Sequence, residues 1–275
     1  MLYIIIILII LILYIIFNYL IKYNIESFTN INSKIPYILF KTGPYDISTN
    51  ELEKLLKMNK INLNVKKVLY YNNQECYDFM KKLQNNIFQA YQNLIPAAYK
   101  ADLWRYCILY KYGGIYGDLT QTFLKNYNVN EYNVDMVLVK DIKPDAIQIS
   151  FMATKPNNKF YKYLIECISN DILHKRKGKN CLDITGPNAF YRYFCKYFNI
   201  YQIPNGTFVL KGLNNDYYKI RIDLKQHELQ NVFINIFNHT IIASTKTKDH
   251  NKNLVLINKR PHYEKLYKQN IIFKN

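Results

Sequence analysis

Hydrophobic residues occur along this chain in runs of different length, and the longest run comes first. It begins at Met1 and ends at Lys22, with no charged residue before Lys22. About 20 apolar residues is the length that crosses the core of a bilayer as a helix. A cleavable signal peptide would have a basic start and small residues before the cleavage site, and neither is present. The pattern predicts a single membrane-spanning anchor over residues 1–22 and a spacer over residues 23–34.

The side of the membrane on which the rest of the chain lies stays open. Lys22, Lys34 and Lys41 follow the span, which by the positive-inside rule favours the cytosol. Two Asn-x-Thr sequons, Asn205–Thr207 and Asn238–Thr240, favour the lumenal side because they are acceptors for glycosylation there.

Shorter apolar runs predict strands, and runs with apolar residues every three or four positions predict helices. The expected strands cover 36–40, 64–71, 115–119, 134–139 and 147–152. The expected helices cover 48–58, 74–83, 97–112, 158–173, 187–198 and 262–269, with an exposed loop at 243–253. Strands alternate with helices over the first half, so the pattern predicts an α/β domain over residues 35–275 with a largely parallel sheet.

The formal charge of +17 changes this picture little. Only five of the 37 basic residues are Arg, and the chain is also rich in Ile, Asn and Tyr, which share A/T-rich codons with Lys. A diffuse positive field attracts anionic membranes and phosphorylated substrates. Specific nucleic-acid binding needs basic residues gathered on one face, and the densest run, His174–Lys179, is short. We therefore expect no specific nucleic-acid partner.

Several common sites are excluded by their missing motifs. The five cysteines include no CxxC pair and are too widely spaced for a disulfide framework. The chain contains no HExxH, GxSxG or GxxxxGK[ST] sequence, so nothing supports a metalloprotease, a serine hydrolase or a P-loop NTPase.

The segment with most chemical information is ADLWRYCILYKYGGIYGDLT, residues 101–120. Asp102 and Arg105 share one face of the expected helix, where a simple intrahelical salt bridge would also explain them. The helix is expected to stop at two glycines and to be followed by a strand that ends near Asp118. Ligands of α/β sheets bind at the carboxyl ends of strands, and a carboxylate there can hold a divalent ion or a sugar hydroxyl.

The spacing A-x-x-x-D-x-x-R-x-x-x-L-x-x-x-G-G-x-Y-x-D over residues 98–118 resembles a known family. It is similar to the core of the DXD-containing glycosyltransferases related to the yeast initiating α-1,6-mannosyltransferases and the glucosylating clostridial toxins. Weaker similarities are the strand Ile35–Thr42 to I-P-K-I-I-H-Q-T, the turn Thr185–Asn188 to T-G-P, and Pro261–Tyr267 to H-Y-x-x-L-W. The resemblance implies a GT-A-like fold, a Rossmann-like mixed sheet flanked by helices.

The resemblance also implies roles for individual residues. Asp102 would accept hydrogen bonds from donor-sugar hydroxyls, Arg105 would contact the sugar or diphosphate, and Asp118 would meet the ribose or a metal; these three are the expected catalytic residues. The expected donor-binding residues are Thr42, Tyr116, Gly113, Gly114, Thr185, Gly186, Pro187 and Asn188.

A divalent metal, Mn²⁺ or Mg²⁺, is the cofactor that the resemblance implies, with Asp118 and Thr120 at the ligand positions. Thr120 replaces the second acid of the DXD motif, and a hydroxyl is a poorer ligand for a hard cation than a carboxylate. Metal binding could be weak, could use Asp135 or Asp141 instead, or could be replaced by Lys and Arg. Lys41 also departs from the family, which often has Gln there.

Together these features predict a membrane-anchored hexosyltransferase that moves a hexose from a nucleotide sugar to a glycan or glycolipid acceptor. The resemblance implies retention of anomeric configuration and metal assistance. The alternative is a catalytically inactive, membrane-tethered homologue that binds glycans or acts as an assembly subunit. A third reading is a basic protein that binds membrane surfaces or nucleic acid.

Overall fold

The computed structural model describes residues 34–44, 49–119, 121–123, 127–226, 232–235, 237–244 and 262–274. Lys34–Asn275 forms one compact unit. Within the ranges just given, no helix combines the length and the apolar character that crossing a membrane requires. The anchor expected at residues 1–22 lies outside the described residues, and so do most of the spacer and most of the loop expected at 243–253.

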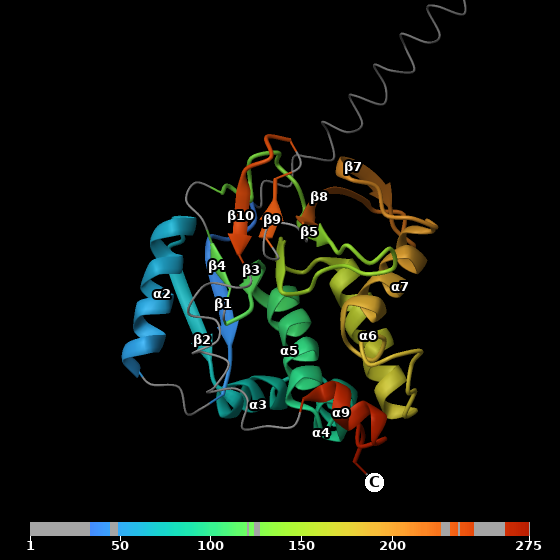
Figure 1. The fold of residues 1–275 in the computed structure, drawn as a ribbon. Helices are drawn as coiled ribbons and strands as arrows, with labels where there is room; N and C mark the ends of the chain where they lie inside the picture. The colour runs from blue at the N-terminus through green and yellow to red at the C-terminus, as the bar shows by residue number, and fades with distance from the viewer. Residues whose placement is uncertain are drawn as a thin grey trace, which may run out of the picture. The chain divides into compact units, whose positions relative to one another are not determined.

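Ten of the described segments are strands of one sheet (Figure 1). The strands are β1 Ile38–Thr42, β2 Lys67–Tyr71, β3 Gly114–Gly117, β4 Thr122–Phe123, β5 Met136–Lys140, β6 Phe151–Thr154, β7 Gly206–Lys211, β8 Tyr217–Gln226, β9 Val232–Ile234 and β10 Ile241–Ser244. Their order is β2-β1-β3-β6-β5-β8-β9-β10-β4, with β7 paired to β8. The helices are α2 Thr49–Leu63, α3 Asn73–Lys81, α4 Asn85–Asn93, α5 Ala97–Tyr112, α6 Lys159–Leu173, α7 Pro187–Phe198 and α9 Tyr263–Lys268.

The sheet is mixed, as the family resemblance implies, and the expectation of a largely parallel sheet is wrong. Strand β1 runs parallel to β2 and β3, and β5 runs parallel to β8. Strand β6 lies between β3 and β5 and is antiparallel to both. The connection from β5 to β6 contains no crossover helix, and a short connection returns the chain in the antiparallel direction.

Helices α5 and α7 have the predicted bounds because their stop signals are local. Gly113 follows α5 with φ +62°, and Asn199 follows α7 in the left-handed conformation, so neither helix can continue. The strand expected at 147–152 begins only at Phe151, since Ile147 makes just an isolated bridge to Lys140. Helix α4 was not predicted, and it begins without a side-chain cap.

Side chains alternate between the two faces of the central strands, which places them in two cores. Phe40, Tyr116 and Met152 pack in one core with residues of helices α3 to α7. Leu39 and Ile115 face the opposite side and pack in the other core, which also contains the last residue of α2. Strand β3 is therefore covered on both faces, and the site described below lies where it ends.

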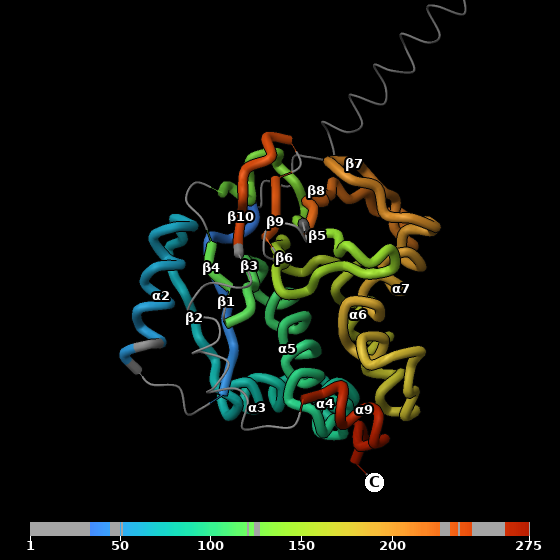
Figure 2. Tube along the Cα trace, in the orientation of Figure 1, coloured from blue at the N-terminus to red at the C-terminus, as the bar shows by residue number. Residues whose placement is uncertain are grey.

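The segment after α9 pairs with the loop between α4 and α5, at the bottom of the molecule, where Figure 2 shows α9 and α4. The backbone N–H of Ile95 donates to the carbonyl of Ile272 at 2.8 Å, and Leu94 bridges to Phe273. In α9 itself, the Tyr263 ring packs on Tyr99 of α5 with a centroid distance of 5.8 Å. The C-terminal H-Y-x-x-L element thus braces the helix that carries Asp102 and Arg105.

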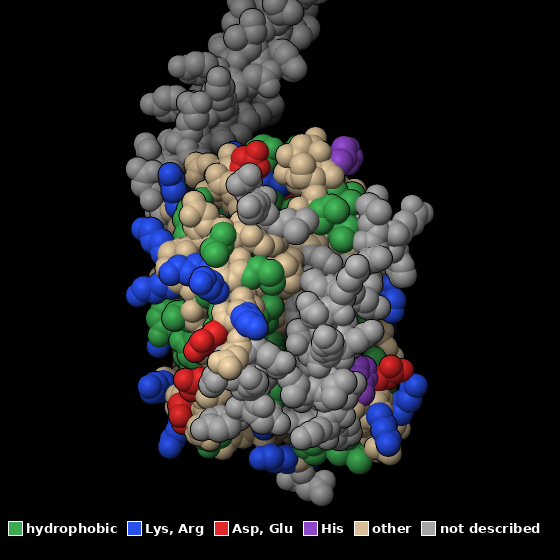
Figure 3. Space-filling model, turned by 60° about the vertical axis from the view of Figure 1, so that its left-hand side comes forward, with side chains coloured by type: hydrophobic (Ala, Val, Ile, Leu, Met, Phe, Trp, Pro, Cys, Tyr) green, Lys and Arg blue, Asp and Glu red, His purple; other side chains and the backbone are tan. Residues whose placement is uncertain are grey.

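Lys and Arg side chains are spread over the face shown in Figure 3 and stand among Asp and Glu side chains. They do not gather in one patch on that face. Its charge pattern is that of a diffuse positive field, as the composition suggested.

Candidate active site

The charged residues of α5 lie within a helix that is buried on nearly every side. Leu103, Trp104 and Tyr106 are all fully buried, because α5 lies beneath the sheet and among the other helices. An all-round apolar helix is typical of a domain core, so charged groups in it need partners. Asp102 and Arg105 are nonetheless only 8% and 6% exposed.

Arg105 connects two carboxylates that come from different elements. Its Nη2 lies 3.0 Å from Oδ1 of Asp102 on the same helix, and its Nη1 lies 3.2 Å from Oδ1 of Asp118 just after β3. Nη1 also donates to the carbonyl of Ile149 at 2.9 Å, and Nε donates to the carbonyl of Ala101 at 3.3 Å. The expectation that α5 delivers Asp102 and Arg105 to the end of β3 is confirmed.

Tyr116 supports this arrangement from β3. Its ring lies under the guanidinium of Arg105, with 4.4 Å from Cζ to the ring centroid. Its hydroxyl donates to Oδ1 of Asp118 at 2.8 Å. The side chain of Asp118 is 42% exposed while that of Arg105 is 7% exposed, so Asp118 is the member of the group that a ligand reaches most easily.

Thr185 completes the group from the T-G-P turn before α7. Its hydroxyl donates to Oδ2 of Asp102 at 2.8 Å, and its carbonyl accepts a hydrogen bond from the Tyr106 hydroxyl at 2.7 Å. Burial raises the pKa of Asp102 to about 6, although the charge of Arg105 and the hydrogen bond from Thr185 both lower it. The three residues to which the resemblance assigns catalytic roles thus share one network with Thr185, which lies 83 positions after Asp102 in the sequence.

The loop that carries Thr185 is itself held by ion pairs. Asp183 accepts from Arg176 and Arg192, each at 3.0 Å. The same two arginines also reach Asp171 in α6, at 3.3 Å and 3.2 Å. These contacts join the loop to α6 and α7 and so fix the position of Thr185.

The other expected donor-binding residues fall at different places. Gly186 precedes α7, whose first residue is Pro187, and Asn188 donates from its side chain to the carbonyl of Asp145 at 2.8 Å. Thr42 ends β1 at the same sheet edge as Asp118, but its hydroxyl donates to the carbonyl of Tyr71 at 2.8 Å.

Gly113 and Gly114 lie at the opposite end of β3 from Asp118. A Cβ on Gly113 would be 2.6 Å from Pro156, and a Cβ on Gly114, where φ is +101°, would be 2.8 Å from the carbonyl oxygen of Ile38. The structure therefore gives these two glycines a role in the turn between α5 and β3 and does not bring them to Asp118.

Lys41 was not expected among the site residues. It is fully buried, and its Nζ donates to the carbonyls of Asp118 at 2.8 Å and Gln121 at 3.1 Å. Burial lowers the pKa of Lys41 to about 7, against the opposing charge of Asp118. The sequence contained one sign that Lys41 is a site residue. It is a charged residue that directly follows Leu39 and Phe40 in an apolar strand.

Ser150 was also missed. The backbone N–H of Asp118 donates to the carbonyl of Ser150 at 2.9 Å, next to the Gly117–Phe151 pair of β3 and β6. This hydrogen bond extends the pairing of β3 and β6 by one residue and brings the backbone of Ser150 beside that of Asp118. The Ser150 hydroxyl is buried and has no hydrogen-bond partner among the described residues. The sequence of the strand expected at 147–152 gave no sign that Ser150 lies beside Asp118.

Each of the two acids suggested as substitute metal ligands is paired with a lysine. Asp135 immediately precedes β5, and Asp141 immediately follows it. Because β5 and β3 are both antiparallel to β6, they run in the same direction, and Asp135 lies at the opposite sheet edge from Asp118. Asp135 is paired with Lys155 at 2.9 Å, and Asp141 lies 3.5 Å from Lys225.

Around Asp118, the described residues do not fit a divalent ion held by carboxylates. One oxygen of Asp118 is taken by Arg105 and Tyr116, and both oxygens of Asp102 have partners. In the part of the chain that the structure describes, no three His, Cys, Asp or Glu residues come together as metal ligands would. Thr120 lies outside that part.

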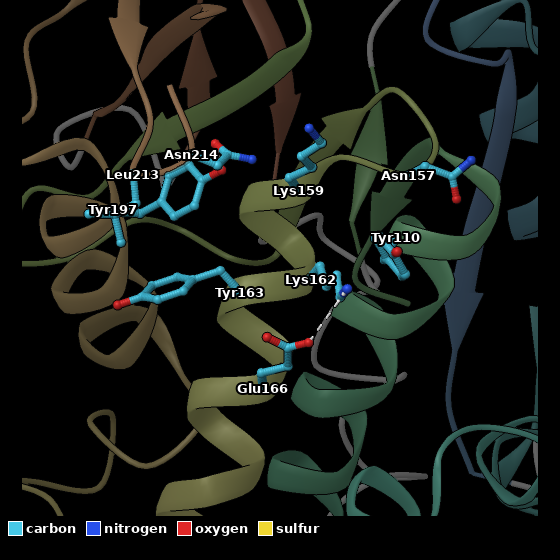
Figure 4. Close-up of a pocket in the computed structure, with 9 residues that line it drawn as sticks. All are labelled: Tyr110, Asn157, Lys159, Lys162, Tyr163, Glu166, Tyr197, Leu213 and Asn214. Atoms are coloured by element: carbon cyan, nitrogen blue, oxygen red, sulfur yellow. Dashed lines mark hydrogen bonds and ion pairs between the residues drawn. The ribbon is translucent and has the colours of Figure 1, made fainter. Parts of the chain in front are cut away.

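A separate cavity of about 570 Å³ opens between α6, α7 and the C-terminal half of α5 (Figure 4). Its lining combines aromatic and polar side chains: Tyr110, Asn157, Lys159, Lys162, Tyr163, Glu166, Tyr197, Leu213 and Asn214. Tyr110 follows Asp102 by eight residues, about 12 Å along the helix axis. The cavity therefore does not include the Arg105 network.

Comparison with known proteins identifies the segment that contains this network. Residues 20–140 match the family described as glycosyltransferase sugar-binding region containing DXD motif. A solved structure named PaToxG glycosyltransferase is similar, with 17% identity, a TM-score of 0.49, and coverage of 66% of this chain and 79% of that chain. A search of curated proteins gave no match. The family match supports a glycosyltransferase and confirms the family resemblance seen in the sequence.

Proposed function

We propose, from the match of residues 20–140 to the DXD-containing sugar-binding region, that this protein is a glycosyltransferase acting on a nucleotide sugar. It transfers a hexose to a glycan or glycolipid acceptor with retention of configuration, and residues 1–22 anchor it in a membrane. The Mn²⁺ or Mg²⁺ implied by the resemblance is left out of the proposal, because the described acids do not fit such an ion at Asp118.

The observation that carries the proposal is the position of Arg105 between Asp102 and Asp118 at the carboxyl end of β3. A guanidinium has five N–H donors. Its contacts with Ala101, Ile149, Asp118 and Asp102 use four of them, which leaves one on Nη2 among the described contacts. That donor is available to an oxygen of the diphosphate or the sugar.

The surroundings of Arg105 suit an anionic leaving group. The guanidinium is buried and held by three elements, so it needs no reorganisation when charge develops on a departing diphosphate. Fixed donors in a poorly hydrated site stabilise such charge more than flexible donors in water do. Asp102 and Asp118 keep free lone pairs and can accept hydrogen bonds from sugar or ribose hydroxyls.

The test is hydrolysis of a panel of UDP- and GDP-sugars by the full-length protein in detergent. We expect one donor to be hydrolysed, and we expect Asp118→Asn and Arg105→Lys to lower kcat/KM by about 100-fold. Asp216→Asn is the matched control, because Asp216 is 41% exposed and forms an ion pair with Lys159 outside the site. If folded Asp118→Asn and Arg105→Lys variants turn over donor at the wild-type rate, the site assignment is wrong.

A second candidate function is glycan binding without catalysis, and Thr120 in place of the second acid is the observation that favours it. This function predicts that no member of the donor panel is hydrolysed or bound, while immobilised glycans retain the protein. Donor hydrolysis by the wild-type protein contradicts it.

A further inference from the structure

Lys41 ties together the two ends of the chain segment that follows β3. Its Nζ donates to the carbonyl of Asp118 at 2.8 Å and to that of Gln121 at 3.1 Å. The backbone N–H of Gln121 also donates to the carbonyl of Asp118 at 2.9 Å, and Leu119 lies in a turn. Lys41 lies in β1, the parallel neighbour of β3, so its hydrogen bonds connect this turn to the sheet.

The ammonium group of Lys41 has its described hydrogen-bond acceptors in this turn. An ammonium group that is fully buried loses its hydration, and it stays in place only where acceptors and negative charge compensate. Here the acceptors are the two carbonyls, and the negative charge is the nearby carboxylate of Asp118. The Phe123 ring lies 5.7 Å from Nζ and closes the remaining side. An apolar side chain at position 41 would leave both carbonyls without this donor.

Two basic side chains therefore hold Asp118 from different directions. Arg105 binds its carboxylate, and Lys41 binds its main-chain carbonyl. In a site built on two acids, a bound divalent ion would fix the same segment and supply positive charge beside the diphosphate. The described acids do not fit such an ion, while the positive charge and the anchoring are both present in protein side chains.

We propose that Lys41 is a positioning residue that holds the turn after β3 in place of a metal-bound second acid, so that the donor binds at Asp118 and Arg105 without a divalent ion. This inference rests on the proposed function, because it requires a nucleotide-sugar site at these two residues. An anionic donor beside Asp118 stabilises the ammonium of Lys41 further, since opposite charges at short range attract strongly where water is excluded.

The experiment compares full-length wild type with Lys41→Gln, Lys41→Met and Lys41→Arg, each in EDTA and in Mn²⁺. Donor hydrolysis and the binding of UDP and GDP are both measured. We expect wild-type values to agree within about twofold in the two conditions. We expect Lys41→Gln and Lys41→Met to lower kcat/KM by about 100-fold, since misplacing catalytic groups by about 1 Å has an effect of that size. Lys41→Arg keeps the charge and the donors, so we expect it to retain activity within about tenfold of wild type.

Lys140→Gln is the matched control, because Nζ of Lys140 also donates to a backbone carbonyl, that of Ile203 at 3.1 Å, at the end of another strand. We expect it to keep wild-type activity. Thermal unfolding of every variant separates loss of fold from loss of position. The inference is overturned if EDTA abolishes wild-type hydrolysis and Mn²⁺ restores it, or if folded Lys41→Gln equals wild type. Should Lys41→Gln and Lys41→Met fail to fold, an inactive but folded Lys41→Arg, or wild-type activity that requires Mn²⁺, still overturns it.

The two levels of failure are distinguishable. Wild-type protein that neither hydrolyses any donor nor binds UDP or GDP, in EDTA or in Mn²⁺, contradicts the proposed function. Wild-type protein that is active only with Mn²⁺ contradicts the role of Lys41 alone.

Discussion

Arg105 and Asp118 lie 3.2 Å apart, from Nη1 to Oδ1, with a helix end, a glycine turn and a strand between them in the sequence. The chain reverses direction at Gly113, so β3 runs back alongside α5. This reversal brings Asp118, just after β3, next to Arg105 on the helix. The side chain of Asp118 is 42% exposed, so the pair joins the buried Arg105 to the solvent-exposed surface. The predictions below test what this arrangement requires.

Donor turnover should fall as the pH drops through about 6. Burial raises the pKa of Asp102 from 3.8 to about 6, and only the ionised form holds Arg105. A folded pKa above the unfolded value means that the folded state binds the proton more tightly. Any contribution of this group to stability is therefore present below about pH 4 and lost as the pH rises to 6, the opposite direction from activity. A plot of kcat/KM against pH checks this, because the fall below about pH 6, the acidic limb of the plot, should be present in wild type. An Asp102→Asn variant should have low activity, and its kcat/KM should show no such fall.

Thr185→Val should move the acidic limb to higher pH. The Thr185 hydroxyl donates to Oδ2 of Asp102 and lowers its pKa, and valine has the same shape without the donor. We also expect a loss of about 1.5 to 3 kcal/mol in the free energy of unfolding, the usual range for a hydrogen bond to a charged group. Thr154→Val is the control, because Thr154 is fully buried but donates to the carbonyl of Asp135. An unmoved limb in folded Thr185→Val would contradict the coupling.

Tyr116→Phe should lower kcat/KM by about tenfold while the fold is kept. The change removes the hydrogen bond to Asp118 but leaves the ring under Arg105. Asp118 then loses one of the groups that orient it. A hydrogen bond of this kind contributes about 1 kcal/mol or more of stabilising free energy. Tyr127→Phe is a close control, since Tyr127 donates to Asp223 and its ring lies 5.1 Å from Arg221 in a similar cluster away from Asp118. Equal activities of the two variants would count against an orienting role for Tyr116.

Gly114→Ala should destabilise the fold by about 2 kcal/mol or more. At φ +101° an L-residue is strained, and the new Cβ would lie 2.8 Å from the carbonyl oxygen of Ile38. Gly206→Ala measures the strain without the collision, because φ there is +92° and nothing lies within 4 Å. Urea unfolding of both variants checks this, and Gly114→Ala should be the less stable of the two. A smaller effect at Gly114 than at Gly206 would show that β1 moves to make room.

The sequence alone determined those features that depend on near neighbours in the chain. The bounds of α5 and α7 follow from local stop signals at Gly113 and Asn199. Asp102 and Arg105 meet because residues three apart share a helix face, whatever surrounds the helix. The motif spacing over residues 98–118 also led to the glycosyltransferase family, because it records residue types and separations that need no coordinates.

Only the tertiary structure decided which distant groups join that pair. Thr185 reaches Asp102 across 83 positions, and Lys41 reaches the carbonyl of Asp118 across 77. Such contacts depend on the order and direction of the strands. Strand β6 lies antiparallel between β3 and β5 and brings the backbone of Ser150 beside that of Asp118, and no short sequence pattern predicts this position. Residue patterns report burial and periodicity, whereas the partners of a buried charge are chosen by the packing of whole elements. For that reason Asp102, Arg105 and Asp118 could be proposed from the sequence, while their contacts with Thr185, Lys41 and the Ser150 carbonyl could not.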